Sequence, residues 1–514
     1  MHQLYLNLSL VLGLILGAAS LYVGLRLGFN FGVALLTVFC WSMLQRVLLR
    51  LAPDLKPLSD ADLACHQSFT SAMSYSSGTV MATALGALFL IEVPLETVPT
   101  AIWLASICVL GSLLALPLRR ALLARLPFPS GRAAAETARG ILQVDRFKSF
   151  APALFGSAGL TLLVQQLPTG FRSIGFVSLS PMLLGLGALL GSAAYAMALG
   201  GLFFFGLPGL QTGGLLAESS VPWFAVGIML AAGGWELVGF LKPRQEACES
   251  LDRPSRLWWF AVAATMCVTL VSGAFLGLKQ PTWMLPMIAA LPLFVFVSCR
   301  VTGETDVVPI GALGKLALLM FGLLLSSYDT QSALLATAVL AGVAAAAADF
   351  STDMRCGKEL GCPPQRQLKY QVTGAIIGPL ALVPFFFWLT SEVAPIGSEE
   401  LPAPAAQIWL DIAMISFREA VFWGRQGPAL MTGLVLGLLW TALYRNTAWG
   451  NRWLPQPLAF ATAAYLDLST VLTLACGAFL AQQFKKQNDI PLWSALLAGE
   501  SITQVFILSA IALF

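Results

Sequence analysis

The chain has 514 residues, of which 57% are hydrophobic and 11% are charged, and its formal net charge is +3. Soluble domains carry about a quarter charged residues, so this composition excludes a water-soluble fold. The net charge is too small to indicate a protein that binds nucleic acid.

Apolar runs of about the length that crosses a bilayer, roughly 20 residues, recur along the chain. They cover residues 4–25, 31–49, 99–118, 257–278, 284–297 and 372–389. The runs are continuously apolar, as in residues 333–348, which is typical of helices and not of the alternating strands of a β-barrel. Counting shorter and interrupted segments, we expect an all-α polytopic membrane protein with about 16 transmembrane or re-entrant helices in the lipid bilayer.

The first run lacks a small-residue cleavage site, so we interpret it as a retained helix and not as a signal peptide. His66, Gln67 and Ser68 then open a stretch rich in Ser and Thr. These side chains could line a polar path, or they could simply pack helices together.

Residues 119–148 hold seven Lys and Arg residues and only two acids, Glu136 and Asp145. Because short cytoplasmic loops are rich in Lys and Arg, this segment should be cytoplasmic, which also places the N-terminus inside. The connections that carry Glu92 and Glu96, and later residues 392–400, hold no Lys or Arg and should lie outside. Ser130 is a plausible N-cap for the Ala-rich helix that follows it.

Three stretches punctuated by Gly and Pro, residues 180–210, 302–325 and 402–416, are candidates for discontinuous helices. Such helices expose backbone groups that can hold a substrate or ions in transporters. The second basic segment, residues 242–256, requires an even number of crossings after the first. Residues 180–210 should therefore form a hairpin or a broken helix.

Acidic residues at membrane depth are candidate functional groups, because burying them is costly. Glu304 and Asp306 lie between two apolar segments, where they could handle substrate or protons or could belong to a surface loop. Glu500 lies near the middle of the last span, as a proton site or as a hydrogen-bonding link between helices. Asp349 and Asp353 open a segment of mixed charge, residues 349–369, which favours a solvated loop over a functional site.

No cofactor is expected. The nine cysteines are scattered and give no disulfide framework, and Cys356 and Cys362 are the only pair within one polar loop. With two histidines and no paired C-x-x-C spacing, a metal site lacks ligands.

No phosphate-binding Gly-Lys-Ser or Gly-Lys-Thr loop is present, which argues against ATP-driven transport. A nucleophile–base pair at span centres is also missing, which argues against an enzyme.

The chain contains a weak internal repeat, since residues 22–26 at the end of the first span resemble residues 275–279 at the end of a later span. We expect two related halves, residues 1–256 and 257–514.

Residues 116–137 resemble a signature of the oligopeptide transporter superfamily, with Pro127, Pro129, Gly131 and Glu136 at the offsets of that motif. Further similar segments keep the family's order at residues 22–28, 303–315, 349–353 with 371–378, and 498–501.

The resemblance implies two halves of about eight helices each and secondary active transport driven by protons. Its substrates would be small peptides or peptide-like metal chelates, and its location the bacterial inner (plasma) membrane. The residues expected along the substrate or proton pathway are Glu304, Asp306, Glu500, Gln67, Ser68 and Asp349. The alternative is a membrane-embedded enzyme or a non-transporting scaffold, and both a monomer and a homodimer are compatible with the sequence.

Overall fold

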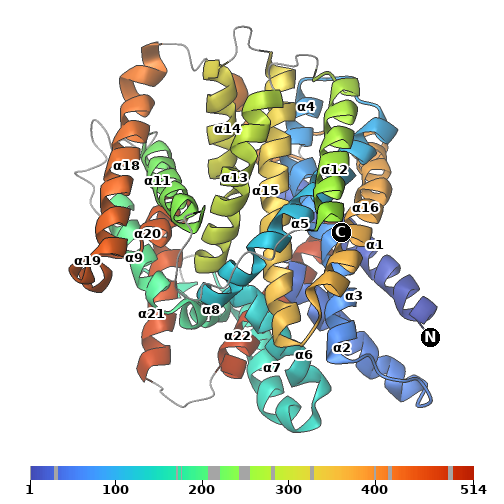
Figure 1. Ribbon diagram of the computed structural model, residues 1–514. Helices are drawn as coiled ribbons and strands as arrows, with labels where there is room; N and C mark the ends of the chain where they lie inside the picture. The colour runs from blue at the N-terminus through green and yellow to red at the C-terminus, as the bar shows by residue number, and fades with distance from the viewer. Residues whose placement is uncertain are drawn as a thin grey trace.

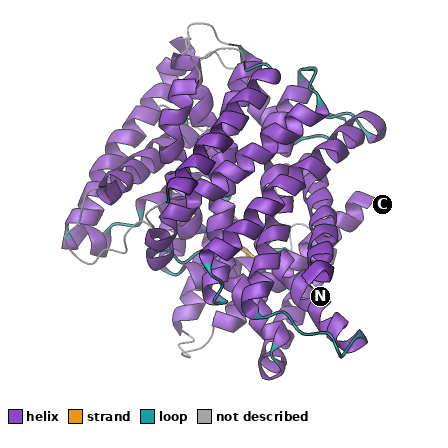
Figure 2. Cartoon of the chain, turned by 45° about the vertical axis from the view of Figure 1, so that its right-hand side comes forward, coloured by secondary structure: helices purple, strands orange, loops and turns teal. Residues whose placement is uncertain are grey.

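The computed structural model describes residues 2–27, 33–168, 172–174, 176–205, 220–241, 255–278, 284–324, 329–398, 401–414, 420–483 and 490–513. These residues are almost entirely helical (Figure 2), apart from one antiparallel pair of two-residue strands, β1 (Ser173–Ile174) and β2 (Val177–Ser178). The expected all-α class is confirmed.

The helices of the first part of the chain are α1 (His2–Leu27), α2 (Val33–Leu51), α3 (Asp60–Val80), α4 (Gly86–Leu90), α5 (Thr97–Arg125), α6 (Pro129–Leu142), α7 (Val144–Gln166), α8 (Pro181–Leu190), α9 (Ser192–Phe205) and α11 (Val221–Leu241). One π-helical turn, Met81–Leu85, joins α3 to α4.

The helices of the second part are α12 (Arg256–Phe275), α13 (Met284–Thr305), α14 (Ile310–Leu324), α15 (Thr330–Glu359), α16 (Pro364–Trp388), α17 (Pro404–Met414), α18 (Ala420–Asn446), α19 (Ala448–Trp453), α20 (Pro457–Thr462), α21 (Leu468–Gln483) and α22 (Ile490–Leu513). A π-helical turn, Leu389–Val393, follows α16, and a 3-10 turn, Ala463–Tyr465, follows α20.

Within the described ranges, nine helices are long and apolar enough to cross a membrane, or ten if the bent pair α8–α9 counts as one span. The chain is therefore a multi-pass membrane protein. The expected total of about 16 helices stays a prediction.

Helix α15 runs through the middle of the bundle (Figure 1), and its most apolar 18-residue stretch is completely buried by protein. Small side chains make this possible, because they let neighbouring backbones come close. A methyl group on Gly111 of α5, for example, would lie 2.5 Å from the carbonyl oxygen of Val343.

The prediction of a solvated loop at residues 349–369 is wrong. α15 continues to Glu359, and Asp349, Asp353 and Cys356 are all buried within it. Only residues 360–363 separate α15 from α16. The charged residues here do not mark a solvated face, because other parts of the chain supply their partners.

Residues 180–210 do contain a broken helix, as predicted. α8 and α9 meet at an angle of 114°, and the residue between them, Gly191, has φ of +61°. A positive φ is strained for residues with a Cβ, so glycine suits the bend. The later segment with α20 and α21 packs against this pair; a methyl group on Gly187 would lie 1.9 Å from the carbonyl oxygen of Leu474.

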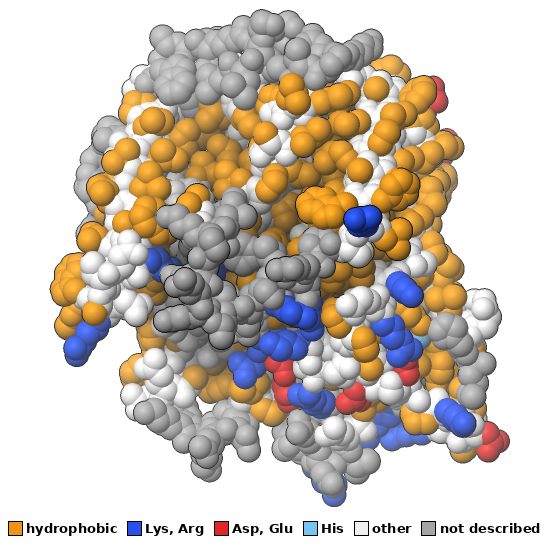
Figure 3. All heavy atoms as spheres, viewed as in Figure 1, with side chains coloured by type: hydrophobic (Ala, Val, Ile, Leu, Met, Phe, Trp, Pro, Cys, Tyr) orange, Lys and Arg blue, Asp and Glu red, His pale blue; other side chains and the backbone are white. Residues whose placement is uncertain are grey.

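The basic segment at residues 119–148 is not a loop. α5 extends to Arg125, and α6 and α7 follow with only short connections. Lys and Arg side chains gather toward the end of the molecule that holds α6 and α7, whereas hydrophobic side chains dominate the surface above it (Figure 3). The cytoplasmic orientation of this end stays a prediction.

Candidate functional site

The densest group of buried polar side chains lies where α3, α15 and α16 pack together. α3 contributes Gln67, Ser68 and Ser71, each fully buried. α15 contributes Asp349 and Asp353, which are one helical turn apart and share a face. We call these five residues, together with Gln367 and Gln371 of α16, the central polar cluster.

Direct hydrogen bonds join the three helices. The Gln67 amide donates to the Asp353 carboxylate over 2.6 Å, and the Gln367 amide donates to the Ser68 hydroxyl over 2.8 Å and to the Asp353 carbonyl over 2.7 Å. Gly357 leaves room for the Gln367 side chain, since a methyl group there would lie 2.1 Å from its Oε1 atom. The packing of the three helices thus holds the side chains of the central polar cluster together.

The two carboxyl groups of the cluster are only partly satisfied. Gln371 lies against Asp349, and Ser71 lies against Asp353. One oxygen of each carboxyl group, Oδ2, is buried without a hydrogen-bond partner in the described part of the chain. Two negative charges one turn apart in a dry interior repel each other strongly, so a proton on one of them would remove most of that cost. The arrangement can therefore hold and release a proton.

His66 precedes this cluster on α3 and sits in an aromatic environment. The rings of Tyr5, Trp41 and Tyr370 have centroids 6.1, 5.2 and 5.2 Å from the imidazole centroid. The Ser9 hydroxyl is 2.7 Å from the imidazole Nδ1 atom. His66 was not among the expected pathway residues, and it lies beside the central polar cluster in a mainly aromatic setting.

Glu304 lies in the last turn of α13 and forms a buried ion pair with Arg300, with 2.5 Å between the charged atoms. Asp306 directly follows that helix and has φ of +62°. Its Oδ1 atom accepts hydrogen bonds from the Ser130 backbone N–H over 3.0 Å and from the Ser130 hydroxyl over 2.8 Å. Burial raises the pKa of the Asp306 carboxyl, and the two Ser130 donors oppose that rise.

The capping of α6 therefore differs from the sequence expectation. Helix α6 begins at Pro129, so Ser130 lies inside the first turn, and the preceding residue, Phe128, adopts a left-handed conformation. The side chain that accepts from the first-turn N–H of Ser130 is Asp306, 176 residues further along the chain. Because this partner is so distant in the sequence, a local pattern could not reveal it, and the prediction of Ser130 as the N-cap is wrong.

The segment with Pro127, Pro129, Gly131 and Glu136 anchors α6 on neighbouring helices. The Phe128 N–H donates to the Gly303 carbonyl over 3.0 Å. A methyl group on Gly131 would lie 2.4 Å from the Thr352 carbonyl oxygen of α15, so only glycine allows this approach. The motif is therefore a packing element next to the central polar cluster.

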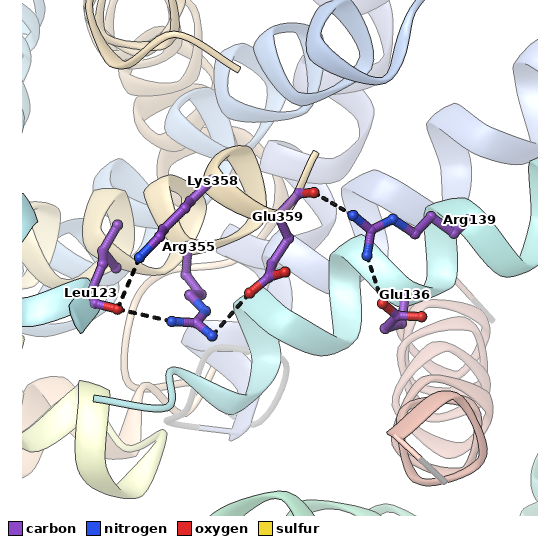
Figure 4. Close-up of polar contacts among 6 residues, drawn as sticks. All are labelled: Leu123, Glu136, Arg139, Arg355, Lys358 and Glu359. Atoms are coloured by element: carbon purple, nitrogen blue, oxygen red, sulfur yellow. Dashed lines mark hydrogen bonds and ion pairs between the residues drawn. The ribbon is translucent and has the colours of Figure 1, made fainter. Parts of the chain in front are cut away.

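Charged groups fasten the same end of α15 (Figure 4). Arg139 of α6 pairs with Glu136 over 2.7 Å and donates to the Glu359 carbonyl. Arg355 pairs with Glu359 over 2.9 Å and donates to the Leu123 carbonyl over 3.0 Å, and Lys358 donates to that same carbonyl. Cations near the free carbonyls that end α5 are favourable electrostatically, so this network holds α5, α6 and α15 together.

Glu500 lies within α22, as expected, and its carboxylate is surrounded by donors. Its Oε2 atom accepts from the Ser180 hydroxyl and from the Met182 N–H, both over 2.8 Å, and its Oε1 atom accepts from the Gln504 amide over 2.7 Å. Because Met182 lies in the first turn of α8, Glu500 caps that helix and offsets its dipole.

Lys315 is a partly buried cation that was not predicted as a site residue. It lies in α14 between apolar residues, and its ammonium nitrogen is 5.5 Å from the ring centroid of Tyr465. The Tyr465 hydroxyl donates to the Pro222 carbonyl over 2.9 Å. Among the described residues, Lys315 has no acidic partner. A lone lysine in an apolar helix is a signal that could have identified it.

The pathway residues expected from the sequence thus fall into three groups. Gln67, Ser68 and Asp349 come together in the central polar cluster. Glu304 and Asp306 lie at the end of α13 against α6, and Glu500 of α22 contacts the start of α8. Asp353, Gln367 and Gln371 were not named as site residues. In the part of the chain that is described, no three His, Cys, Asp or Glu side chains are grouped as metal ligands.

Comparison with known proteins gives two kinds of similarity. A family model described as "OPT oligopeptide transporter protein" matches residues 5–180 and 251–511. A Saccharomyces cerevisiae protein named "putative oligopeptide transporter" is 27% identical over 267 residues, which cover 48% of this chain and 36% of that protein.

An Oryza sativa subsp. japonica protein named "probable metal-nicotianamine transporter" is 29% identical over 159 residues, which cover 30% of this chain and 23% of that protein. The aligned regions thus span about a third or less of the length of these relatives.

Proposed function

Because the chain belongs to the OPT oligopeptide transporter family, we propose that it carries oligopeptides or peptide-like metal chelates across a membrane by secondary active transport coupled to protons. Family membership points to transport and away from catalysis. The names of the yeast and rice relatives support the two substrate classes.

The central polar cluster is the observation that carries proton coupling. Secondary transport needs a group that takes up a proton in one state and releases it in another, and a change in burial or in hydrogen bonding produces such a difference. Asp349 and Asp353 are buried side by side in α15, and each has one oxygen without a partner. Their hydrogen-bond donors come from α3 and α16, so movement of either helix relative to α15 changes their environment.

Lys315 supplies a second element that this function needs. Free peptides end in a carboxylate, and carboxylates are common groups in metal chelators. A positive charge at membrane depth without an acidic partner is suited to attract such a group. The proposal therefore assigns substrate carboxylate binding to Lys315 and proton binding to Asp349 and Asp353.

Sequence patterns support the rest of the proposal. The inner (plasma) membrane is the location that the family resemblance implies. The end of the molecule with α6 and α7 lies in the cytoplasm, because Lys and Arg concentrate there. Residues 1–256 and 257–514 form two related halves. Glu304 and Glu500 adjoin the pathway in a structural role, because each is already held by polar partners.

Uptake into proteoliposomes tests the function. The full chain is reconstituted, and labelled di- to tetrapeptides or iron chelates are offered outside with and without an inward proton gradient. We expect uptake of at least one class, accelerated by the gradient. A folded protein that takes up neither class would support the alternative of a membrane scaffold, and uptake independent of the gradient would refute proton coupling.

A further inference from the structure

Two cysteines that are 297 residues apart in the chain meet beside the central polar cluster. Cys65 lies in α3, and Cys362 lies in the short connection between α15 and α16. Their sulfur atoms are 3.2 Å apart, and both side chains are buried. Sulfur atoms in a disulfide are about 2.05 Å apart, so a small approach would allow a bond. The sequence placed Cys362 with Cys356 in one polar loop, but Cys356 lies within α15, six residues before Cys362.

The surroundings of Cys362 favour reaction of its thiol. The hydrogen bond with Cys65 and the nearby positive charge of Arg366 lower the pKa of the Cys362 thiol, and burial opposes that effect. Arg366 is itself held in place by an ion pair with Asp62 of α3. A thiol of lowered pKa presents more thiolate, which is the form that attacks disulfides.

Cys362 also lies within reach of the surface. Its neighbours Gly361 and Pro363 are exposed, and Gly361 has φ of +75°. The Cys362 N–H donates to the Gly357 carbonyl over 2.7 Å, and this bond secures the short turn. Opening of residues 360–363 would expose the Cys362 sulfur, whereas Cys65 stays inside α3. The order of reaction follows from this difference.

We propose that Cys65 and Cys362 form a reversible disulfide by exchange with a small-molecule disulfide. The Cys362 thiolate attacks one sulfur of that molecule, which forms a mixed disulfide and releases one thiolate. Cys65 loses its proton and attacks the Cys362 sulfur, which forms the Cys65–Cys362 bond and releases the second thiolate. The protons of the two cysteines end on the two released thiols, and the small disulfide is the oxidant.

The disulfide locks α3 to the connection between α15 and α16. Cys65 precedes Gln67 by two residues, and Cys362 precedes Gln367 by five, so the bond lies next to both amides that donate to Asp353. If transport requires α3 or α16 to move against α15, the oxidised protein is slow and the reduced protein is active. This consequence rests on the proposed function, whereas the formation of the bond does not.

Mass spectrometry of the purified full chain tests the bond directly. The protein is incubated with glutathione disulfide, alkylated and digested. We expect a peptide pair linked through Cys65 and Cys362 that dithiothreitol removes. Cys65→Ser should stop at a glutathione adduct on Cys362, and Cys362→Ser should give neither product. Cys356→Ser is the matched control, since it removes a buried thiol from the same region and should leave the link intact.

A folded, monodisperse protein that yields only adducts, or a link between Cys356 and Cys362, would overturn the proposal. Uptake into proteoliposomes is measured on the same samples, and we expect at least about a fivefold decrease on oxidation of the wild type and none in Cys65→Ser. Equal uptake in oxidised and reduced wild type would refute the lock. Absence of uptake from the reduced protein would refute the proposed function, while the linked peptide is still scored independently.

Discussion

Two of the buried carboxylate sites, Glu500 and the pair Asp349 and Asp353, differ in how many hydrogen-bond donors surround them. Glu500 accepts from Ser180, Met182 and Gln504, and both of its oxygens are occupied. Asp349 and Asp353 lie together in α15, and one oxygen of each has no partner in the described chain. A carboxylate saturated with donors is stabilised in its charged form, whereas a crowded, incompletely bonded pair favours taking up a proton. Depth in the membrane alone does not separate a structural acid from a functional one.

The largest effect should come from Asp353→Asn. The asparagine keeps the volume and can still accept from Gln67, but it cannot titrate. We expect proton-driven uptake to fall by about 100-fold, within the range that positioned proton transfer contributes. Asp349→Asn should act similarly. Uptake that keeps its rate and pH dependence in both folded variants would contradict the assignment of the pair as the proton site.

Substitution of Lys315 extends the comparison to a buried cation. Lys315→Met should reduce uptake of peptides with a free C-terminal carboxylate by about tenfold, consistent with the roughly 1.5–3 kcal/mol of a charged hydrogen bond. C-terminally amidated peptides should be affected much less, and Lys315→Arg should retain part of the activity. An equal loss for free and amidated peptides would show that Lys315 does not bind the carboxylate.

Glu500→Gln tests the other side of the comparison. We expect uptake to stay within about twofold of the wild type, while thermal unfolding shows a loss of about 1–3 kcal/mol, because one donor is left facing an amide nitrogen. Loss of pH-dependent uptake without loss of stability would instead place Glu500 on the proton pathway, as the sequence first suggested.

The smallest effect should come from Asp306, which caps α6. Asp306→Ala should lower stability by about 1 kcal/mol, the usual magnitude for a lost cap. Burial raises the pKa of the Asp306 carboxyl in the folded state. The stability that protonation of this carboxyl contributes is therefore fully present below the unfolded-state pKa, and it is lost as pH rises through the folded-state pKa. Thermal unfolding across that range should lose this pH dependence in Asp306→Asn, and an unchanged profile would contradict it.

Local sequence was enough to predict some features of this fold. Continuous apolar runs identified many of the helices. Two basic segments on the same side of the membrane require an even number of crossings between them. This requirement predicted a hairpin or a broken helix within residues 180–210, and the structure has the break at Gly191. Glu500 was also placed correctly within the last helix. These features depend on residues that are close together in the sequence and on the need to cross the bilayer, so a single sequence is enough to predict them.

Other features depend on partners far away in the chain. Residues 349–359 have the composition of a solvated segment, yet they are helical and packed. The Leu123 carbonyl accepts from Arg355, and Arg139 donates to the Glu359 backbone carbonyl. Gln67 and Asp353, which are 286 residues apart, meet in the same way. Without an alignment, a single sequence carries no record of such pairs. Lys315 is different, because it is the one charged residue of the apolar helix α14, and local sequence is enough to identify it.

The complete burial of α15 has a consequence for the synthesis of this protein in the cell. A helix that carries Asp349 and Asp353 would pay a solvation penalty while exposed to lipid, yet α3 and α5, which surround it, are translated earlier. A prepared partner surface is therefore available when α15 leaves the translocation channel. α16 follows after four residues and brings Gln367 and Gln371, which complete the polar contacts. The order of elements along the chain thus limits the time during which these carboxyl groups face hydrocarbon.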